Sequence, residues 1–342
     1  MRFSFDPLPA GFVLSKPLQQ EAYDPKVVED LDGAQRLVIT RKRDGWKLFV
    51  VKYQNTTKIY TDGLKEITHL LPHIALELRQ LPMPNRTILV GEGVFEKNGA
   101  DLFTKACSCL NPNRKDNYYL EDGLEKISLI LFDVVFWGGA HYGQTMPYFD
   151  RLMLVRGLPK LGRIRNSAKE IARGNGSNPN RLEGCRYIRG VEWLDADLAL
   201  VKDRAVKWGW EGLVLYDRDF RSDFRINGKN PQRIKGCYKW KPIHEDDFII
   251  RTWDRCENNR KRLKDVNLRQ IDPATGKEFD CGKLGGFSEE MRRRIKRMKK
   301  PLVLMVKYEQ RFPSGKLRNA RFMRIRADKK TEACIAPKSF NS

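Results

Sequence analysis

The chain has 342 residues, of which 41% are hydrophobic and 10% aromatic, which excludes a disordered basic tail and leaves room for two domains. Its 65 Lys and Arg against 43 Asp and Glu give a formal charge of +22, so we expect a polyanionic partner, nucleic acid first and a membrane surface second. No apolar run approaches the roughly 20 residues that span a bilayer, and four histidines with seven scattered cysteines argue against a zinc site or a histidine-based catalytic site.

The first half of the chain predicts several strands and one substantial helix. Runs rich in β-branched and apolar residues predict strands at 36–40, 48–53, 87–95 and 127–136, the last one buried. Arg41–Lys47 lies between the first two, and its Asp44-Gly45 pair is typical of a tight link between adjacent strands, because glycine accepts a positive φ. Helical spacing of apolar residues predicts a helix over Leu64–Gln80, with a bend at Pro72.

The second half of the chain divides near residue 243, where Pro242 precedes an acidic run. Before this point we expect helices near 150–156 and 194–208, strands at 211–216 and 237–241, and surface excursions at 163–189 and 221–235. Beyond it, short strands are predicted at 248–253, 266–271, 279–284, 302–308 and 322–326, with one helix at 288–299 that Ser288 caps. We therefore predict an α+β domain over residues 1–243 and a small β-barrel of the oligonucleotide-binding (OB) type over residues 244–342.

Lys42 is the candidate nucleophile. The predicted link would fix its amine at a strand end, and an amine whose pKa is lowered by neighbouring cations can attack an electrophile. Arg41, Arg43 and Lys47 are close in sequence and would supply these cations. Taken alone, the stretch is equally typical of a solvated charged hairpin, so the decision depends on the residues that accompany it.

Two glutamates and two lysines farther along the chain carry chemistry of their own. Glu92 and Glu211 are isolated carboxylates beside glycines in apolar strands, a pattern that suits Mg²⁺ and ribose hydroxyls but is also that of an ordinary edge-strand glutamate. Lys239 and Lys241 are two residues apart and would share one face of a strand. Such a pair suits charge neutralisation of a triphosphate or, alternatively, a solvated basic edge.

Five motifs in order resemble the covalent nucleotidyltransferase superfamily, which comprises the polynucleotide ligases and the mRNA capping guanylyltransferases. They are Lys42-Arg43-Asp44-Gly45, Gly91-Glu92-Gly93, Leu131-Phe132-Asp133-Val134, Glu211-Gly212-Leu213-Val214 and Lys239-Trp240-Lys241. The C-terminal third is similar to the barrel domain of ATP-dependent DNA ligases, through the segments 282–287, 306–308 and 315–322 and through Arg326-Ala327-Asp328-Lys329. The likeness covers nearly the whole chain.

The resemblance implies an ATP-grasp-like adenylation domain, an OB-fold domain and the reaction of an ATP-dependent DNA ligase. Lys42 would attack the α-phosphate of ATP to form lysyl-AMP, and AMP would then pass to the 5′-phosphate of a nick. The 3′-hydroxyl would finally displace AMP, with Mg²⁺ assisting each transfer. In such enzymes Glu92 would contact the ribose and the metal, and Glu211 the metal.

Further contacts with the nucleotide are implied by the other motifs. Phe132 would stack on the adenine, although an aromatic residue in an apolar strand more often belongs to the core. Lys239 and Lys241 would neutralise the triphosphate. Arg326 and Lys329 would orient the leaving pyrophosphate, a role that requires the barrel to close onto the nucleotide domain.

Three positions depart from the family pattern. Lys47 replaces an arginine, and a lysine neutralises phosphate without offering a bidentate fork. Thr40 replaces a glutamate that is common in DNA ligases as an adenine-reading group, and Thr61-Asp62 replaces a Ser-Arg pair. Thr40, Arg41 and Lys47 are still expected in the nucleotide site.

The expected partner is nicked double-stranded DNA. Basic stretches at 163–189, 221–235, 255–264 and 292–300 fit contacts with the DNA backbone without sequence specificity, because no base-reading module is present. We expect an intracellular protein, since no targeting signal is evident. We also expect a monomer that closes as a clamp around DNA. Because Lys42 lies so near the start, the chain resembles a minimal ligase without a further N-terminal DNA-binding domain. The alternatives are an RNA ligase or a GTP-using capping guanylyltransferase, and a non-catalytic basic protein that binds nucleic acid.

Overall fold

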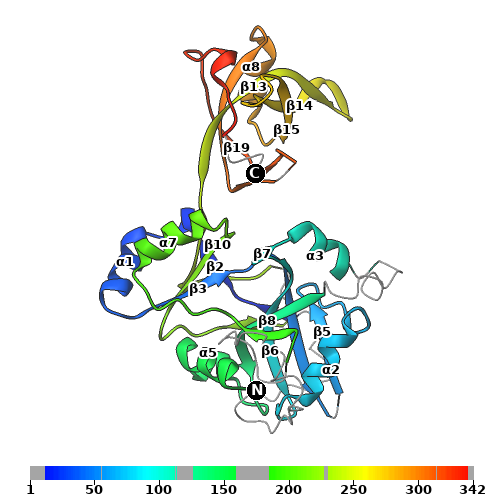
Figure 1. Cartoon of the computed structure of the whole chain (residues 1–342), viewed down its shortest axis with the longest axis vertical. Coiled ribbons are helices and arrows are strands. Elements are labelled where there is room, and N and C mark those ends of the chain that lie inside the picture. Colours follow the sequence, from blue (N-terminus) through cyan, green and yellow to red (C-terminus); the bar gives the residue numbers. More distant parts are fainter. Residues whose placement is uncertain are drawn as a thin grey trace. The chain divides into compact units, whose positions relative to one another are not determined.

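The structure is a computed structural model that describes residues 12–54, 56–111, 113, 126–158, 185–226, 230–312 and 314–337. The chain divides into two compact units, Met1–Trp240 and Lys241–Ser342 (Figure 1). Most of the excursion predicted at 163–189 lies outside the described residues, as does 227–229 within the predicted basic loop.

A large sheet forms the centre of the first unit. Its strands run in the order β5-β4-β6-β8-β9, and β7 pairs with β6. They are β4 (Trp46–Tyr53), β5 (Thr56–Thr61), β6 (Thr87–Lys97), β7 (Ala100–Asp101), β8 (Ile127–Phe136) and β9 (Ile188–Gly190). All neighbours are antiparallel except β8 and β9, which run parallel. The strands predicted at 48–53, 87–95 and 127–136 are confirmed, and they lie side by side.

Two predicted helices begin later in the chain than expected. α2 spans Pro72–Gln80, with Pro72 in the first turn, where its missing N–H is not needed, so the predicted start at residue 64 and the bend at Pro72 are wrong. α7 spans Leu198–Lys207, because the carboxylate of Asp197 accepts hydrogen bonds from the N–H groups of the first turn and fixes its start. The remaining helices are α1 (Pro25–Gly33), α3 (Phe103–Leu110), α4 (Tyr142–Thr145) and α5 (Tyr148–Gly157).

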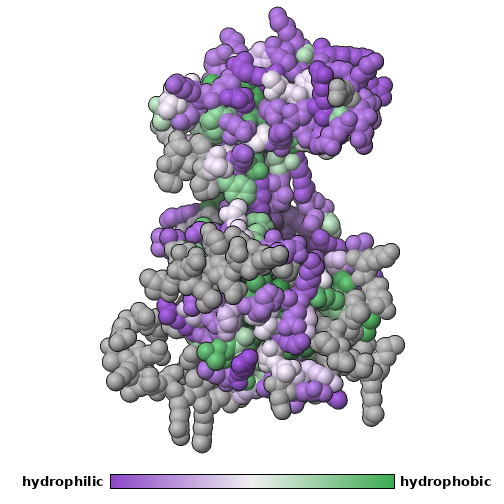
Figure 2. All heavy atoms as spheres, turned by 90° about the vertical axis from the view of Figure 1, so that its right-hand side faces the viewer, coloured by the Kyte–Doolittle hydropathy of each residue, from purple (hydrophilic) through white to green (hydrophobic). Residues whose placement is uncertain are grey.

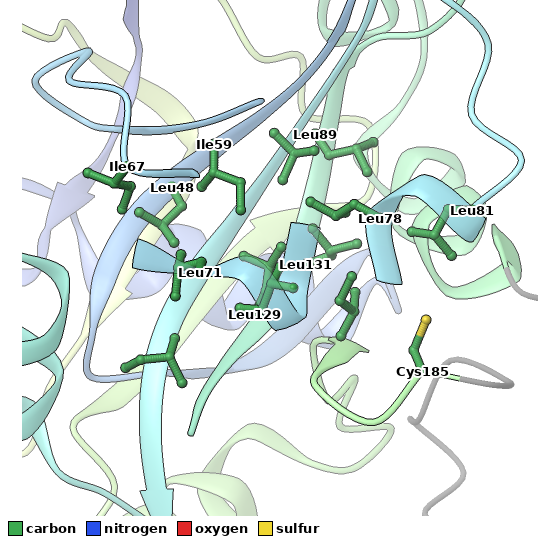
Figure 3. Close-up of a cluster of buried hydrophobic side chains, with 14 of the residues drawn as sticks. Leu48, Ile59, Ile67, Leu71, Leu78, Leu81, Leu89, Leu129, Leu131 and Cys185 are labelled. Atoms are coloured by element: carbon green, nitrogen blue, oxygen red, sulfur yellow. The ribbon is translucent and has the colours of Figure 1, made fainter. Parts of the chain in front are cut away.

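Both faces of the large sheet are buried. Leu48 and Val50 of β4 pack on one face with apolar residues of α2, and Phe49 and Val51 pack on the other, as alternation along a strand requires. Figure 3 shows the first of these clusters, in which leucines and isoleucines of the strands surround those of α2 and of the segment before it. A sheet buried on both sides is a rigid support for side chains at its edges.

A second sheet of four strands belongs to the same unit, in the order β2-β12-β10-β3. Its strands are β2 (Lys16–Gln19), β3 (Leu37–Lys42), β10 (Gly212–Asp217) and β12 (Arg233–Trp240), while β1 (Val13–Leu14) pairs separately with β11 (Phe224–Arg225). Apolar residues of α1 and α7 form one core cluster with those of β3 and β10. These helices therefore fix the strand that ends at Lys42.

The link between Lys42 and Trp46 passes from one sheet to the other. β3 pairs with β10, whereas β4 pairs with β5 and β6, so the prediction that the flanking strands are adjacent is wrong. Gly45 is needed because a Cβ at this position would collide with the carbonyl oxygen of Gly93 in β6. The expected reason, a positive φ, does not apply, because the φ of Gly45 is not positive. Lys42 consequently lies where the two sheets meet.

In its described residues, the second unit contains a five-stranded antiparallel sheet, one α-helix, and a short hairpin of β17 (Gln310–Arg311) and β18 (Leu317–Arg318). The order is β15-β14-β13-β16-β19, with β13 (His244–Cys256), β14 (Asn259–Ile271), β15 (Glu278–Leu284), β16 (Leu302–Tyr308) and β19 (Arg321–Ile325). α8 spans Glu289–Arg297, and the Ser288 hydroxyl accepts a hydrogen bond from the N–H of Met291 at 3.2 Å, which confirms the predicted cap. In the described part of this unit no ladder joins β15 to β19, so a closed barrel stays a prediction.

The positive charge of the chain is concentrated in the second unit. Its 102 residues contain 27 Lys and Arg against 14 Asp and Glu, an excess of 13 out of the total of 22. Hydrophilic residues cover most of its face in the upper part of Figure 2. Such a surface suits a polyanionic partner. Across the described ranges, no helix has the length and apolar character to cross a membrane.

Candidate active site

A cleft of about 230 Å³ opens in the first unit, with walls from both sheets. It is lined by residues of β2, β3, β4, β6, β8, β10 and β12. Among them are many of the residues predicted for the nucleotide site: Thr40, Arg41, Lys42, Lys47, Glu92, Phe132 and Lys239. Glu211 joins this group through its bond to Lys42. Positions spread over about 200 residues of sequence thus converge on one cleft.

Lys42 is fixed by the pairing of two strands. It is the last residue of β3 and lies opposite Gly212 at the start of β10, which brings Glu211 beside it. The Lys42 ammonium donates a hydrogen bond to the Glu211 carboxylate. Their side chains are only 16% and 7% exposed, so the pair is held in partly buried surroundings. The direction of the amine is therefore set before any substrate binds.

Glu92 completes a group of two carboxylates and one amine. The pKa of Glu92 is raised to about 7, chiefly by burial and also by the charge of Glu211, while the charge of Lys42 acts in the opposite direction. Lys42 and Glu92 line the same cleft, and Glu211 is paired with Lys42, so the three groups lie close enough to influence one another. A partly buried carboxylate of this kind is stabilised by an added cation, and Mg²⁺ is commonly held by one or two carboxylates together with substrate phosphates. Glu92 and Glu211 therefore fit a magnesium ion. Within the described residues no group of three or more His, Cys, Asp or Glu is arranged to hold a metal ion.

Glu92 should make the stability of the protein depend on pH. The unfolded chain loses this proton near the ordinary pKa of 4.5, whereas the folded protein keeps it until about 7. The contribution of Glu92 is thus fully present below pH 4.5 and is lost as the pH rises through 7. Relative to Glu92→Gln, the wild type should lose on the order of 3 kcal/mol of unfolding free energy over this range. Urea unfolding of both proteins at several pH values measures the difference, and parallel profiles would contradict it.

Phe132 lies at the border between the cleft and the core. It lines the cleft from β8, is partly buried, and also packs against two clusters of core residues. Its carbonyl oxygen accepts a hydrogen bond from the Tyr148 hydroxyl at 3.1 Å. Asp133, the next residue, is bound by Arg151 with 2.7 Å between Oδ1 and Nε. The strand that carries the ring is thereby fixed from behind.

Arg41 and Arg43, the expected cationic neighbours of Lys42, are themselves paired with carboxylates. Arg43 donates hydrogen bonds to Asp101 at 2.6 and 3.1 Å and to Glu192 at 2.9 Å. Nη2 of Arg41 lies 3.6 Å from the same Asp101 carboxylate. These carboxylates offset both guanidinium charges, and the action of the two arginines on the lysine stays a prediction.

Asp101 is a site residue that the sequence did not single out. Its Oδ2 accepts a hydrogen bond from the backbone N–H of Asp44 at 3.0 Å, in addition to its bonds with Arg43. Asp101 thereby connects β7 to the link that follows Lys42 and helps to hold Lys42 in position. No motif marks Asp101, and only the folding of β7 onto β6 brings it to the link.

Lys47 is paired within the cleft. Its Nζ lies 2.7 Å from Asp62, and the second oxygen of Asp62 lies 2.8 Å from Nζ of Lys16. Burial lowers the pKa of Lys47, and the charge of Asp62 acts in the opposite direction. Asp62 stood out in the sequence only as a departure from the family pattern, and Lys16 was missed.

Lys239 and Lys241, the two lysines of the motif Lys239-Trp240-Lys241, lie in different surroundings. Lys239 lies in β12 opposite Val214 and lines the cleft. Lys241 follows the end of β12 at Trp240 and belongs to the second unit, so the prediction that both lysines share a strand face is wrong. Nζ of Lys241 lies 2.6 Å from the carboxylate of Glu309.

Arg326 and Lys329 also belong to the second unit. Both bind the buried carboxylate of Asp247, at 3.1 Å from Nη1 of Arg326 and 2.6 Å from Nζ of Lys329. Arg326 is bound in addition by Asp328. Inside their own unit, the two cations are therefore matched by carboxylates.

The sequence is similar to curated DNA ligases, although no protein-family model matches it. It is 24% identical over 352 residues to DNA ligase 1 of Korarchaeum cryptofilum, a match that covers 95% of this chain and 59% of that protein. With the DNA ligase of Thermococcus fumicolans it shares 26% identity over 318 residues, or 85% of this chain and 52% of the other. The chain thus spans little more than half the length of these relatives.

Solved ligase structures share the fold. One from a study of Lig E DNA ligases, described as DNA binding with a minimal scaffold, covers 92% of this chain and 99% of its own, with a TM-score of 0.59 and 16% identity. Pmar-Lig_PreS3 covers 91% of this chain and 67% of its own, with a TM-score of 0.60 and 20% identity. The predicted α+β fold class is thereby confirmed.

Proposed function

We propose that this chain is an ATP-dependent DNA ligase that seals nicks in double-stranded DNA. The observation that carries the proposal is the arrangement of the cleft. Lys42 is held there by its hydrogen bond to Glu211, and Glu92 and Lys239 line the same cleft. The shared fold and the DNA ligase relatives support the proposal.

Lys42 is the nucleophile in this proposal. Its neutral amine attacks the α-phosphorus of ATP, so that a P–N bond forms while the bond to the pyrophosphate oxygen breaks. Glu211, which accepts a hydrogen bond from this amine, can take up the proton that is lost. Lys239 offers positive charge to the phosphates as negative charge develops on the leaving group.

Two further transfers complete the reaction. The 5′-phosphate at the nick takes AMP from Lys42, and the 3′-hydroxyl then attacks that phosphate and releases AMP. Mg²⁺ bound by Glu92 and Glu211 would supply charge neutralisation for the phosphates. Thr40 and Phe132 border the space for adenosine, and Arg326 and Lys329 of the second unit would act on the pyrophosphate once released from their own carboxylates.

The proposed DNA contacts are electrostatic. The basic excess of the second unit suits the phosphate backbone, and contacts with phosphates carry no sequence information. We expect one copy of the chain to close around the duplex. Because its contacts are with phosphates, binding should weaken steeply as the salt concentration rises.

Labelling with nucleotide tests the first step. Incubation with α-³²P-ATP and Mg²⁺ should leave a radioactive adduct that survives denaturing gels, whereas α-³²P-GTP should not. In a second assay, a nick in duplex DNA should be sealed faster than the same nick in duplex RNA. Labelling by GTP would instead favour a capping guanylyltransferase, a preference for RNA would favour an RNA ligase, and no adduct with either nucleotide would favour a non-catalytic protein.

A further inference from the structure

One carboxylate at the rim of the cleft bridges two lysines from different strands. Asp62 follows the end of β5, and its Oδ2 and Oδ1 lie 2.8 Å from Nζ of Lys16 in β2 and 2.7 Å from Nζ of Lys47 in β4. We call these three residues the rim cluster. Two cations share one anion, so the rim cluster keeps a net positive charge.

The rim cluster lies where two hollows meet. All three of its residues line the cleft, and Lys47 and Asp62 also line a second, more open hollow of about 400 Å³. The other walls of the second hollow are formed by Trp46, Thr61, Gly63, Lys65, Asn111 and Asn113. A ligand too long for the cleft would extend into this hollow and pass the rim cluster on its way.

The geometry of the rim cluster is that of a phosphate site occupied by a side chain. A carboxylate that gives one oxygen to each of two ammonium groups makes the same contacts as the two non-bridging oxygens of a phosphodiester. Burial raises the pKa of Asp62, but the two lysines and their hydrogen bonds lower it by more, so Asp62 remains ionised and bound to them. Its side chain is 42% exposed, against 18% for Lys47, so it can turn away into solvent more readily than the lysine.

We propose that Lys16 and Lys47 bind a backbone phosphate of the polynucleotide and that Asp62 is the internal competitor for this position. The inference rests on the proposed function for the identity of the ligand. ATP is the less suitable occupant, because the cluster adjoins a hollow outside the cleft. The polynucleotide must displace Asp62 to bind, so this residue weakens DNA binding and reduces its salt dependence.

The test compares Asp62→Asn with a matched control. Asp219→Asn removes the same charge from a surface pair with Arg36, and this residue does not line either hollow. Binding of a nicked duplex with a 5′-phosphate is measured by fluorescence anisotropy over a range of KCl, without ATP. Asp62→Asn should bind roughly three- to tenfold more tightly than Asp219→Asn, with a salt slope steeper by about one.

Two further variants decide whether the lysines are responsible. Lys16→Ala with Lys47→Ala should bind more weakly than the wild type, and adding Asp62→Asn to them should give no gain. The proposal is overturned if Asp62→Asn binds no better than Asp219→Asn, or if the gain persists without the two lysines. An equal gain in affinity for ATP would assign the site to the nucleotide and overturn the polynucleotide assignment.

The outcome can be separated from that of the ligase proposal. Formation of the AMP adduct by the wild type tests the ligase proposal and does not depend on DNA binding. If the adduct forms but Asp62→Asn binds no more tightly than the control, only the present inference fails. If no adduct forms but the expected binding pattern is seen, the phosphate site stands and the ligase proposal fails.

Discussion

Replacement of Lys42 by alanine is expected to reduce the AMP adduct by at least about a thousandfold, because the proposal assigns the attack on the α-phosphorus to this amine. The side chain is only 16% exposed and bound to Glu211, so its amine is already directed for attack. Lys42→Arg should be equally inactive, since a guanidinium keeps the positive charge but is not deprotonated in proteins. Denaturing gels after incubation with α-³²P-ATP measure the effect.

A surface lysine provides the control for this variant. Lys58 of β5 pairs with Glu66, is 41% exposed and does not line the cleft. Lys58→Ala should form the adduct as the wild type does. Peptide mapping of the wild-type adduct should locate AMP on Lys42, and an adduct of undiminished yield in Lys42→Ala would show that the nucleophile has been misidentified.

The second large effect is expected at a buried ion pair behind the cleft. Arg151 of α5 is fully buried and binds Asp133 with 2.7 Å between Nε and Oδ1. It also donates hydrogen bonds to the carbonyl oxygen of Met146 at 2.6 Å and to the hydroxyl of Ser222 at 2.8 Å. Arg151→Met leaves a buried carboxylate without its cation, so it should cost about 3–5 kcal/mol of unfolding free energy. Urea unfolding of the full chain measures this cost.

Two companion variants separate the charge from the packing. In the double variant Arg151→Met, Asp133→Asn, the unpaired charge is gone, so it should be more stable than Arg151→Met alone. Arg262→Met removes an exposed partner of Glu289 and should leave the transition nearly unchanged. If Arg151→Met unfolds like Arg262→Met, the buried pair contributes no more than a surface one.

The order of strands and motifs could be predicted because local patterns carry it. Apolar runs such as 127–136 gave the central strands, and Ser288 marked the start of α8. The helix starts were less accurate, because helical spacing of apolar residues also occurs in the segment before Pro72, which forms a short 3-10 helix at Thr68–Leu70 and packs in the same core as α2. Which strands pair across the two sheets of the first unit could not be predicted from the sequence, since this pairing depends on contacts between segments far apart in the chain.

The candidate site could be predicted where a motif names the residue, as for Lys42, Glu92 and Glu211. Its partners could not be predicted, because they come from segments without a motif. Asp101 reaches the link after Lys42 only through the pairing of β7 with β6. Adjacency in sequence also did not reveal the partner of Arg43, whose side chain binds that carboxylate.

By itself, the sequence determined which groups this protein has available for chemistry: one lysine before Asp-Gly, two glutamates beside glycines, and a basic second unit. Only the tertiary structure decided how their charges are matched. It paired Lys42 with Glu211, turned the neighbouring arginines toward Asp101, and set Asp62 between Lys16 and Lys47. The physical reason is that an ion pair depends on distance in space, which strand register and sheet packing fix and sequence separation does not.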